Sequence, residues 1–236
     1  MARSLLVAPA AEDVGLARTC LGFLRALDRR GVKVAFVKPV AQPRADGGPD
    51  RSAARVTAIT GLRPPEPLTT AELEQQLGEG GLDVVLEKIV AAWEPIYDGS
   101  EVVVVEGLRA GPSKLYVSSL NQALARTLDA DVVLADIWPA DGSADGVAEQ
   151  LAIAASGYVS GEQARVVGCV VHGLPGPDAA AAGGPGKFGA AVAALRAVLA
   201  NRKLHLIAAV PHRPELTYSF EGPALSPSTT TTSDPS

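Results

Sequence analysis

Hydrophobic residues in this chain gather into six short aliphatic runs, each bounded by charged residues, glycine or proline. Runs of this length that are rich in valine favour strands over helices, although periodicity alone does not separate the two. Their unbroken apolar character is typical of parallel strands that are buried on both faces. The expected strands are Ser4–Pro9, Lys33–Lys38, Glu101–Glu106, Asp131–Asp136, Arg165–Val171 and Leu206–Pro211.

Between these runs, apolar residues recur three and four positions apart, which is the pattern of helices with one buried face. The first helix is expected from Val14 to Leu27, ending at Arg29–Gly31. Further helices are expected over Thr70–Leu77, Val84–Trp93, Ser118–Leu128, Ala144–Ala155 and Ala190–Leu199. Alternation of strands and helices predicts an α/β fold with a doubly wound, mostly parallel sheet flanked by helices. Such sheets bind ligands beyond the carboxyl ends of their strands.

Three segments rich in glycine, proline, serine or threonine depart from this alternation. The stretches "QPRADGGPDRSAA" and "GLPGPDAAAAGGPGK" follow the second and fifth expected strands, so we expect loops at the functional edge of the sheet. From about Phe220 the sequence "FEGPALSPSTTTTSDPS" has no apolar periodicity. We therefore expect a single domain over residues 1–219 and a disordered tail over residues 220–236.

Composition narrows the possible partners. The 236 residues include 47% hydrophobic residues, enough for a sizeable core, and carry a formal net charge of −5. This charge argues against binding to nucleic acid or to an anionic membrane, and favours a small molecule or another protein. Cys20, Cys169 and the three histidines lack ligand spacing, so neither a metal site nor a disulfide is expected. The short apolar N-terminal run does not resemble a signal peptide, and we expect a cytoplasmic protein without a membrane span.

The segment "APAAEDVGLART" leads from the first strand into the first helix, where nucleotide-binding proteins of this fold carry a phosphate-binding loop. Such a loop needs a lysine for the terminal phosphates and a hydroxyl for Mg²⁺. Gly15, Leu16 and Ala17 stand where Gly-Lys-Thr would be. We interpret Val14–Ala17 (Val14, Gly15, Leu16 and Ala17) as a degenerate loop, in which Gly15 permits a tight turn and Leu16 packs beneath it.

Several of these segments together resemble the N-terminal domain of long-form bacterial phosphate acetyltransferases, which is similar in turn to dethiobiotin synthetase. The segments are "VGLART", "RGVKVAFVKPVAQPR", "EVVVVEGL", "SLNQALARTLDADVVLA" and "LIAAVPHRPELT", and the resemblance covers Ser4 to about Thr217. It implies a P-loop NTPase-like fold. In that family a leucine already replaces the loop lysine, so Gly15-Leu16 agrees with the family pattern.

The resemblance also points to residues beyond the loop. Lys38, before a proline, and Glu106, before Gly107, match positions that handle phosphate, substrate and Mg²⁺ in dethiobiotin synthetase. The alternative, which we weigh equally, is that Lys38 and Glu106 form an ion pair over the sheet edge. His172 stands where an asparagine reads adenine in such domains, so the predicted ligand crevice comprises Lys38, Glu106, Gly107 and His172. A histidine there weakens the case for nucleotide binding.

Three other features are interpreted as structural rather than as ligand or metal sites. Asn121, near the expected start of a helix, is interpreted as a cap or a packing residue rather than a ligand contact. Asp136 and Asp141 are expected to be solvated acids flanking a turn, although paired carboxylates can hold a metal. The "GGPGK" segment at Gly183–Lys187 does not directly follow a strand and continues with Phe188, so we expect a loop.

The resemblance implies a regulatory or assembly domain. Exchange of the acetyl group between coenzyme A and phosphate would be performed by a separate C-terminal domain. We expect this chain to lack that domain, and so to be a truncated or frameshifted product or a fragment, without catalytic residues or a cofactor of its own. Its expected partners are that catalytic domain, another copy of the chain, or a small metabolite. Two alternatives remain open, a stand-alone ATP-dependent ligase of the dethiobiotin synthetase kind and a metabolite sensor that is not an enzyme.

Overall fold

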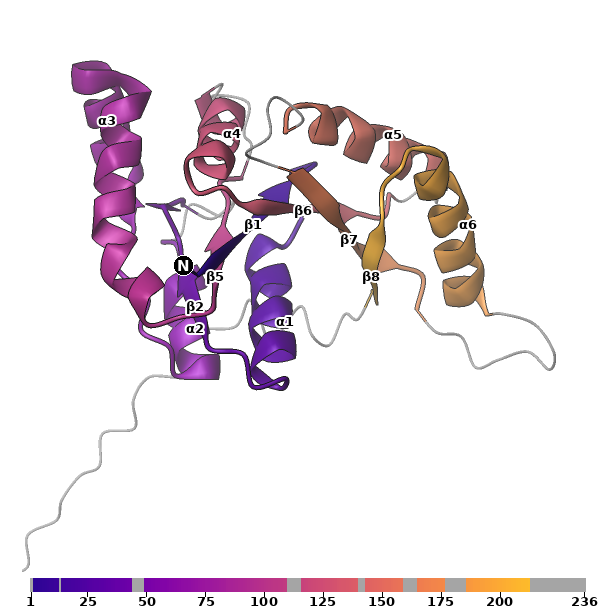
Figure 1. Cartoon of the computed structure of the whole chain (residues 1–236). Helices are drawn as coiled ribbons and strands as arrows, with labels where there is room; N and C mark the ends of the chain where they lie inside the picture. The colour runs from indigo at the N-terminus through magenta and orange to yellow at the C-terminus, as the bar shows by residue number, and fades with distance from the viewer. Residues whose placement is uncertain are drawn as a thin grey trace, which may run out of the picture.

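The computed structural model describes residues 2–12, 14–43, 49–109, 116–139, 143–158, 165–176 and 186–212. Six parallel strands form one sheet in the order β2–β5–β1–β6–β7–β8, with β1 in its interior (Figure 1). They are β1 Arg3–Pro9, β2 Val34–Val37, β5 Val102–Glu106, β6 Asp131–Ile137, β7 Arg165–Leu174 and β8 Leu206–Pro211. A separate parallel pair joins β3 (Val40–Ala41) to β4 (Leu68–Thr69).

Helices cover both faces of the sheet, and the two faces bury separate hydrophobic clusters. Along β1, Leu6 belongs to the first cluster and Val7 to the second, as the alternation of side chains in a strand requires. The first cluster packs beneath α3 (Thr70–Asp98), α4 (Tyr116–Thr127), α5 (Ala144–Ser156) and α6 (Lys187–Asn201). The second packs beneath α1 (Leu16–Asp28) and α2 (Ser52–Thr60).

The doubly wound, mostly parallel sheet predicted from the sequence is confirmed, and each expected strand is present within three residues of its expected ends. Two expected helices, Thr70–Leu77 and Val84–Trp93, belong to the single element α3, whose backbone leaves helical geometry at Gly81 (φ 74°, ψ −173°). Helix α2 was not predicted, because only Val56 of its nine residues is buried. The expected tail over residues 220–236 lies outside the described residues.

The topology brings the carboxyl ends of β1, β2, β5, β6 and β7 to one edge of the sheet. The loop that joins β1 to α1 lies at this edge, as do the positions that follow β2 and β5. This edge is therefore the place to look for the predicted site. None of the helices in the described part of the chain is long and apolar enough to cross a membrane.

Candidate functional site

The loop between β1 and α1 ends at Gly15, whose left-handed backbone (φ 68°, ψ 44°) is readily available only to glycine. Helix α1 begins at the next residue, Leu16, and the amides of Arg18 and Thr19 both bond the Gly15 carbonyl. Leu16 is 2% exposed and belongs to the second hydrophobic cluster. Its side chain therefore points into the core, while Val14 is buried in the same cluster and Ala17 is half-buried.

Arg18, which the sequence reasoning missed, places a cation at this turn. A Cβ built on Gly15 would lie 3.1 Å from Arg18 Nε and 3.3 Å from Nη2, so the guanidinium lies over the glycine. The residue is exposed. A cation at a helix N-terminus opposes the helix dipole, which favours negative charge there. The signal that could have found Arg18 is its position one helical turn after the glycine.

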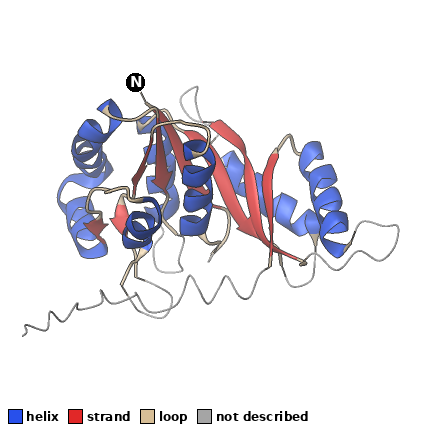
Figure 2. Cartoon of the chain, turned by 90° about the horizontal axis from the view of Figure 1, so that it is seen from below, coloured by secondary structure: helices blue, strands red, loops and turns tan. Residues whose placement is uncertain are grey.

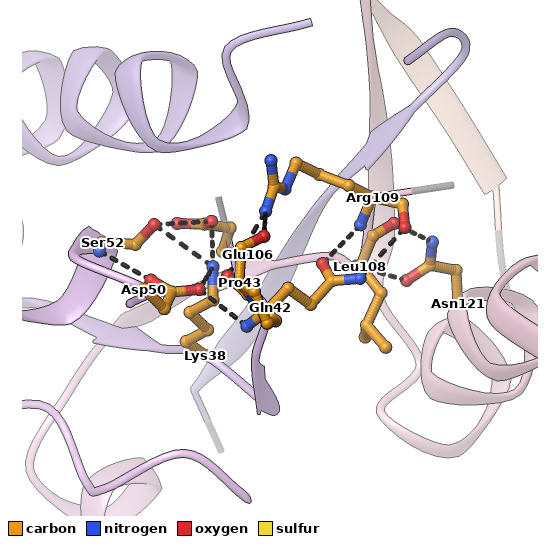
Figure 3. Close-up of polar contacts among 9 residues, drawn as sticks. All are labelled: Lys38, Gln42, Pro43, Asp50, Ser52, Glu106, Leu108, Arg109 and Asn121. Carbon is orange, nitrogen blue, oxygen red and sulfur yellow. Dashed lines mark hydrogen bonds and ion pairs between the residues drawn. The ribbon is translucent and has the colours of Figure 1, made fainter. Parts of the chain in front are cut away.

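Lys38 and Glu106 meet in a buried position where β2 and β5 end (Figure 3). Lys38 Nζ donates to Glu106 Oε1 at 2.5 Å and to Ser52 Oγ at 3.2 Å, and pairs with Asp50 Oδ2 at 2.9 Å. Ser52 Oγ donates to the same Glu106 oxygen at 3.0 Å. An ammonium has three hydrogens, so these three partners occupy all the donors of Lys38. Of the two interpretations of Lys38 and Glu106, the ion pair is the arrangement in the structure.

The charges of this cluster depend on one another. Burial alone would lower the pKa of Lys38, but the carboxylates of Glu106 and Asp50 raise it above its usual value. Burial would raise the pKa of Asp50, but Lys38 and the backbone amides of Ser52 and Gln42 hold it below its usual value. Glu106 Oε2 is buried without a hydrogen-bond partner. The cluster therefore holds two carboxylates against one ammonium.

The loop that follows β5 is held by two side-chain amides, one on each side (Figure 3). Gln42 accepts from the Arg109 amide at 2.7 Å and donates to its carbonyl at 3.0 Å. Asn121 accepts from the Leu108 amide and donates to its carbonyl, both at 2.9 Å. Asn121 lies in the second turn of α4, so the expectation that it caps the helix is wrong. The other expectation, that Asn121 is a packing residue, is correct, because its side chain is buried.

Gly107 occupies a space that has no room for a side chain. A Cβ there would lie 2.8 Å from the carbonyl oxygen of Val7 and 3.1 Å from Asn121 Oδ1. We expect Gly107→Ala to lower the free energy of unfolding by about 1–3 kcal/mol, because the backbone of β1 must move to admit the methyl group.

Urea denaturation measures this change, with Gly22→Ala as the matched control. Gly22 lies exposed in α1, and a Cβ there meets no atom within 4 Å. The control should gain about 0.5–1 kcal/mol from better helix propensity. Equal effects of the two substitutions would contradict the tight approach at Gly107.

His172, at the end of β7, bonds to the protein itself. Its Nε2 lies 2.7 Å from Thr19 Oγ1, and both side chains are buried. Burial, with a smaller contribution from the charge of Arg18, lowers the pKa of His172 to about 4. The imidazole is therefore neutral at physiological pH, and it joins β7 to the first turn of α1.

Asp136 is buried at the end of β6, contrary to the expectation of a solvated acid. Its Oδ1 accepts from the Ile137 amide at 2.8 Å, whereas Oδ2 is buried without a partner. Asp141 lies outside the described residues, as do residues 183–185 of the "GGPGK" segment. In the described ranges, no group of three His, Cys, Asp or Glu side chains is placed to hold a metal ion.

Comparison with known families identifies the domain. A sequence family described as an AAA domain matches residues 3–219. The chain belongs to this family. This AAA domain is the dethiobiotin synthetase-like P-loop domain found in the N-terminal part of phosphate acetyltransferases, so the predicted family is confirmed.

Two relatives show this correspondence. The phosphate acetyltransferase of Deinococcus radiodurans is 36% identical over 225 residues, and that of Pseudomonas putida is 32% identical over 215 residues. Each match covers 91% of this chain and 30% of the relative. The AAA domain therefore spans less than a third of the length of these relatives.

Solved structures support the fold. Signal recognition particle 54 kDa protein from Aeropyrum pernix, solved in complex with GDP, superposes with a TM-score of 0.55 at 15% identity. The superposition covers 90% of this chain and 42% of that protein. At this identity the likeness shows that the AAA domain shares the P-loop NTPase-like fold.

Proposed function

We propose that this chain is a non-catalytic domain that supports the assembly and regulation of a phosphate acetyltransferase, whose acetyl transfer takes place in a separate catalytic region. The observation that carries the proposal is the absence of a free cation at either lysine position of the crevice. Position 16 holds a leucine buried in the core, and Lys38 is fully occupied by Glu106, Asp50 and Ser52. The match to the N-terminal part of phosphate acetyltransferases supports the assignment to that enzyme.

The side chains of Lys38, Glu106, Asp50 and Ser52 are arranged to hold loops in place rather than to transfer a phosphoryl group. Phosphoryl transfer depends on cations that neutralise charge on the transferred group. Removing even one preorganised donor from such a site costs about 3–4 kcal/mol of transition-state stabilisation. The polar side chains after β2 and β5 instead bond to one another, which fixes the loops at this edge. We also propose that Val14–Ala17 is a degenerate phosphate-binding loop.

The first experiment assays the isolated chain for acetyl-CoA formation from acetyl phosphate and coenzyme A. We expect no turnover above the uncatalysed background, with the full-length Deinococcus radiodurans enzyme as the positive control. Turnover comparable to that of the relative would overturn the assignment of catalysis to a separate region.

The second experiment tests assembly. The region of the Deinococcus radiodurans enzyme that matches this chain is deleted, or replaced by residues 1–219 of this chain. Analytical ultracentrifugation should show that deletion changes the oligomeric state and that the chimera restores it. An unchanged oligomer after deletion would contradict an assembly role.

Arg18 supports a second candidate, an ATP-dependent ligase of the dethiobiotin synthetase kind, because its guanidinium lies over the turn where phosphate would bind. Calorimetry with Mg-ATP separates the two functions. The regulatory domain is expected to give no micromolar binding. Binding that Arg18→Ala weakens at least about tenfold, or 1.4 kcal/mol, would favour the ligase candidate instead.

A further inference from the structure

The sheet carries an exposed aliphatic strip on the part of one face that α1 and α2 leave uncovered. Figure 2 shows this face, on which no described helix passes in front of β7 and β8. The strip consists of Ile137 on β6, Val167 on β7, and Ile207 and Val210 on β8. Ile137, Val167 and Ile207 are 44%, 37% and 38% exposed, and Val210 is half-buried.

The register of the strands places these side chains on the face of α1. Val167 and Ile207 alternate with Val166 and Leu206, which pack in the first cluster on the opposite face. Ile137 and Val210 both pair with His172, whose ring contacts Thr19 of α1. Ile207 also lies over Gly168, where a Cβ would come 2.8 Å from Ile207 Cγ1. The strip therefore has two parts, Val167 with Ile207 near the amino ends of β7 and β8, and Ile137 with Val210 on either side of the buried His172 near the carboxyl ends.

Exposed aliphatic side chains are unusual on the face of a parallel sheet. Single apolar side chains on a surface are common, but parallel strands are ordinarily covered on both faces by helices. In this sheet β1, β2 and β5 have α1 against them on this face, and β7 meets α1 near its carboxyl end, where His172 contacts Thr19. On the other face α6 packs against β7 and β8. The distance across three neighbouring strands is about 10 Å, which is the width of one helix. The exposed part of this face, from Val167 on β7 to beyond the edge strand β8, therefore has room for one helix.

The handedness of the connections indicates where such a helix would come from. The crossovers β6–α5–β7 and β7–α6–β8 step outward with their helices on the first face, whereas β1–α1–β2 steps the other way with its helix on the second. Right-handed crossovers require this division. A right-handed crossover that stepped from β8 back across the sheet to a further parallel strand would therefore place its helix over the strip.

We propose that the strip is the docking surface for an amphipathic helix from the polypeptide that follows β8 in phosphate acetyltransferases. The inference rests on the proposed function. The relatives are about three times longer than the matched region, which corresponds to their N-terminal part, so their chains continue beyond it. The occupant presents aliphatic side chains to the strip and polar ones to solvent.

Cysteine labelling tests the docking surface. Ile207→Cys and Val167→Cys are made in this chain and in the Deinococcus radiodurans chimera, because the natural Cys20 and Cys169 are fully buried. Both positions should react rapidly with a maleimide in this chain. In the chimera they should react at least about tenfold more slowly, since labelling then requires local opening of the docked helix. Ile153→Cys, at an isoleucine on α5 that is 68% exposed, should react at the same rate in both.

Other results overturn either the inference or the proposed function. Equal labelling at position 207 in the two proteins means that nothing docks there. Slow labelling in this chain that becomes faster on dilution identifies a second copy as the occupant, and slow labelling independent of concentration identifies the chain's own residues after β8. A chimera that assembles normally with position 207 unprotected refutes the docking surface but leaves the proposed function intact. Protection in a chimera that fails to assemble refutes only the proposed function.

Discussion

Replacing Lys38 by methionine is expected to lower the free energy of unfolding by about 3–5 kcal/mol, the usual cost of removing one partner from a buried ion pair. Methionine keeps an unbranched side chain that is one heavy atom shorter, and it removes the charge. The carboxylates of Glu106 and Asp50 would then stay buried without a cation. Urea denaturation at pH 7, followed by circular dichroism, measures the change.

The matched control is Arg3→Met, which breaks the ion pair between Arg3 and Asp131 on the surface. Arg3 is 68% exposed, and a pair of this kind contributes less than about 1 kcal/mol. A double substitution, Lys38→Met with Glu106→Leu, should recover part of the loss because it removes one unpaired charge. If Lys38→Met costs no more than Arg3→Met, the cluster does not hold the crevice together.

The substitution Asp136→Asn is expected to stabilise the protein at pH 7.5 by about 1–3 kcal/mol. Burial raises the pKa of Asp136 from 3.8 to about 6, against a smaller opposing effect of the Ile137 amide. A raised pKa in the folded state means that folding takes up a proton. The stabilising contribution is complete below pH 4 and is lost as the pH rises through 6. A difference of about two pKa units corresponds to about 3 kcal/mol.

Thermal unfolding of both proteins between pH 4 and pH 7.5 tests this expectation. The natural protein should lose stability, relative to the variant, as the pH rises across this window. The two should be nearly equal at pH 4, because Asp136 is then largely protonated. A variant that is less stable than the natural protein at pH 7.5 would show that Asp136 has an ionic partner at that pH.

The strands and most helices could be predicted because burial on two faces leaves unbroken aliphatic runs in the sequence. Helix α2 could not, since the residues of "SAARVTAIT" bury little and contribute mainly through Ser52 and Val56. The pairing of Lys38 with Glu106 could be predicted, because the two residues lie where the neighbouring strands β2 and β5 end, at the same edge of the sheet.

The other members of the site depend on how loops fold back, which leaves no periodic signal. Asp50 reaches Lys38 because the chain returns after β2, with the Gln42 amide donating to Asp50. The bonds between Asn121 and Leu108 join residues thirteen positions apart. Arg18 was overlooked because the pattern of a phosphate loop directs attention to positions 16 and 17.

The burial of Leu16 limits what a single substitution could do in this domain. A change to lysine at this position would direct an ammonium into a hydrophobic cluster, where an unpaired charge costs several kcal/mol. Phosphate chemistry at this loop would therefore require the core around α1 and the partners of Lys38 to change together. Because each change alone is destabilising, such chemistry is out of reach of any one substitution.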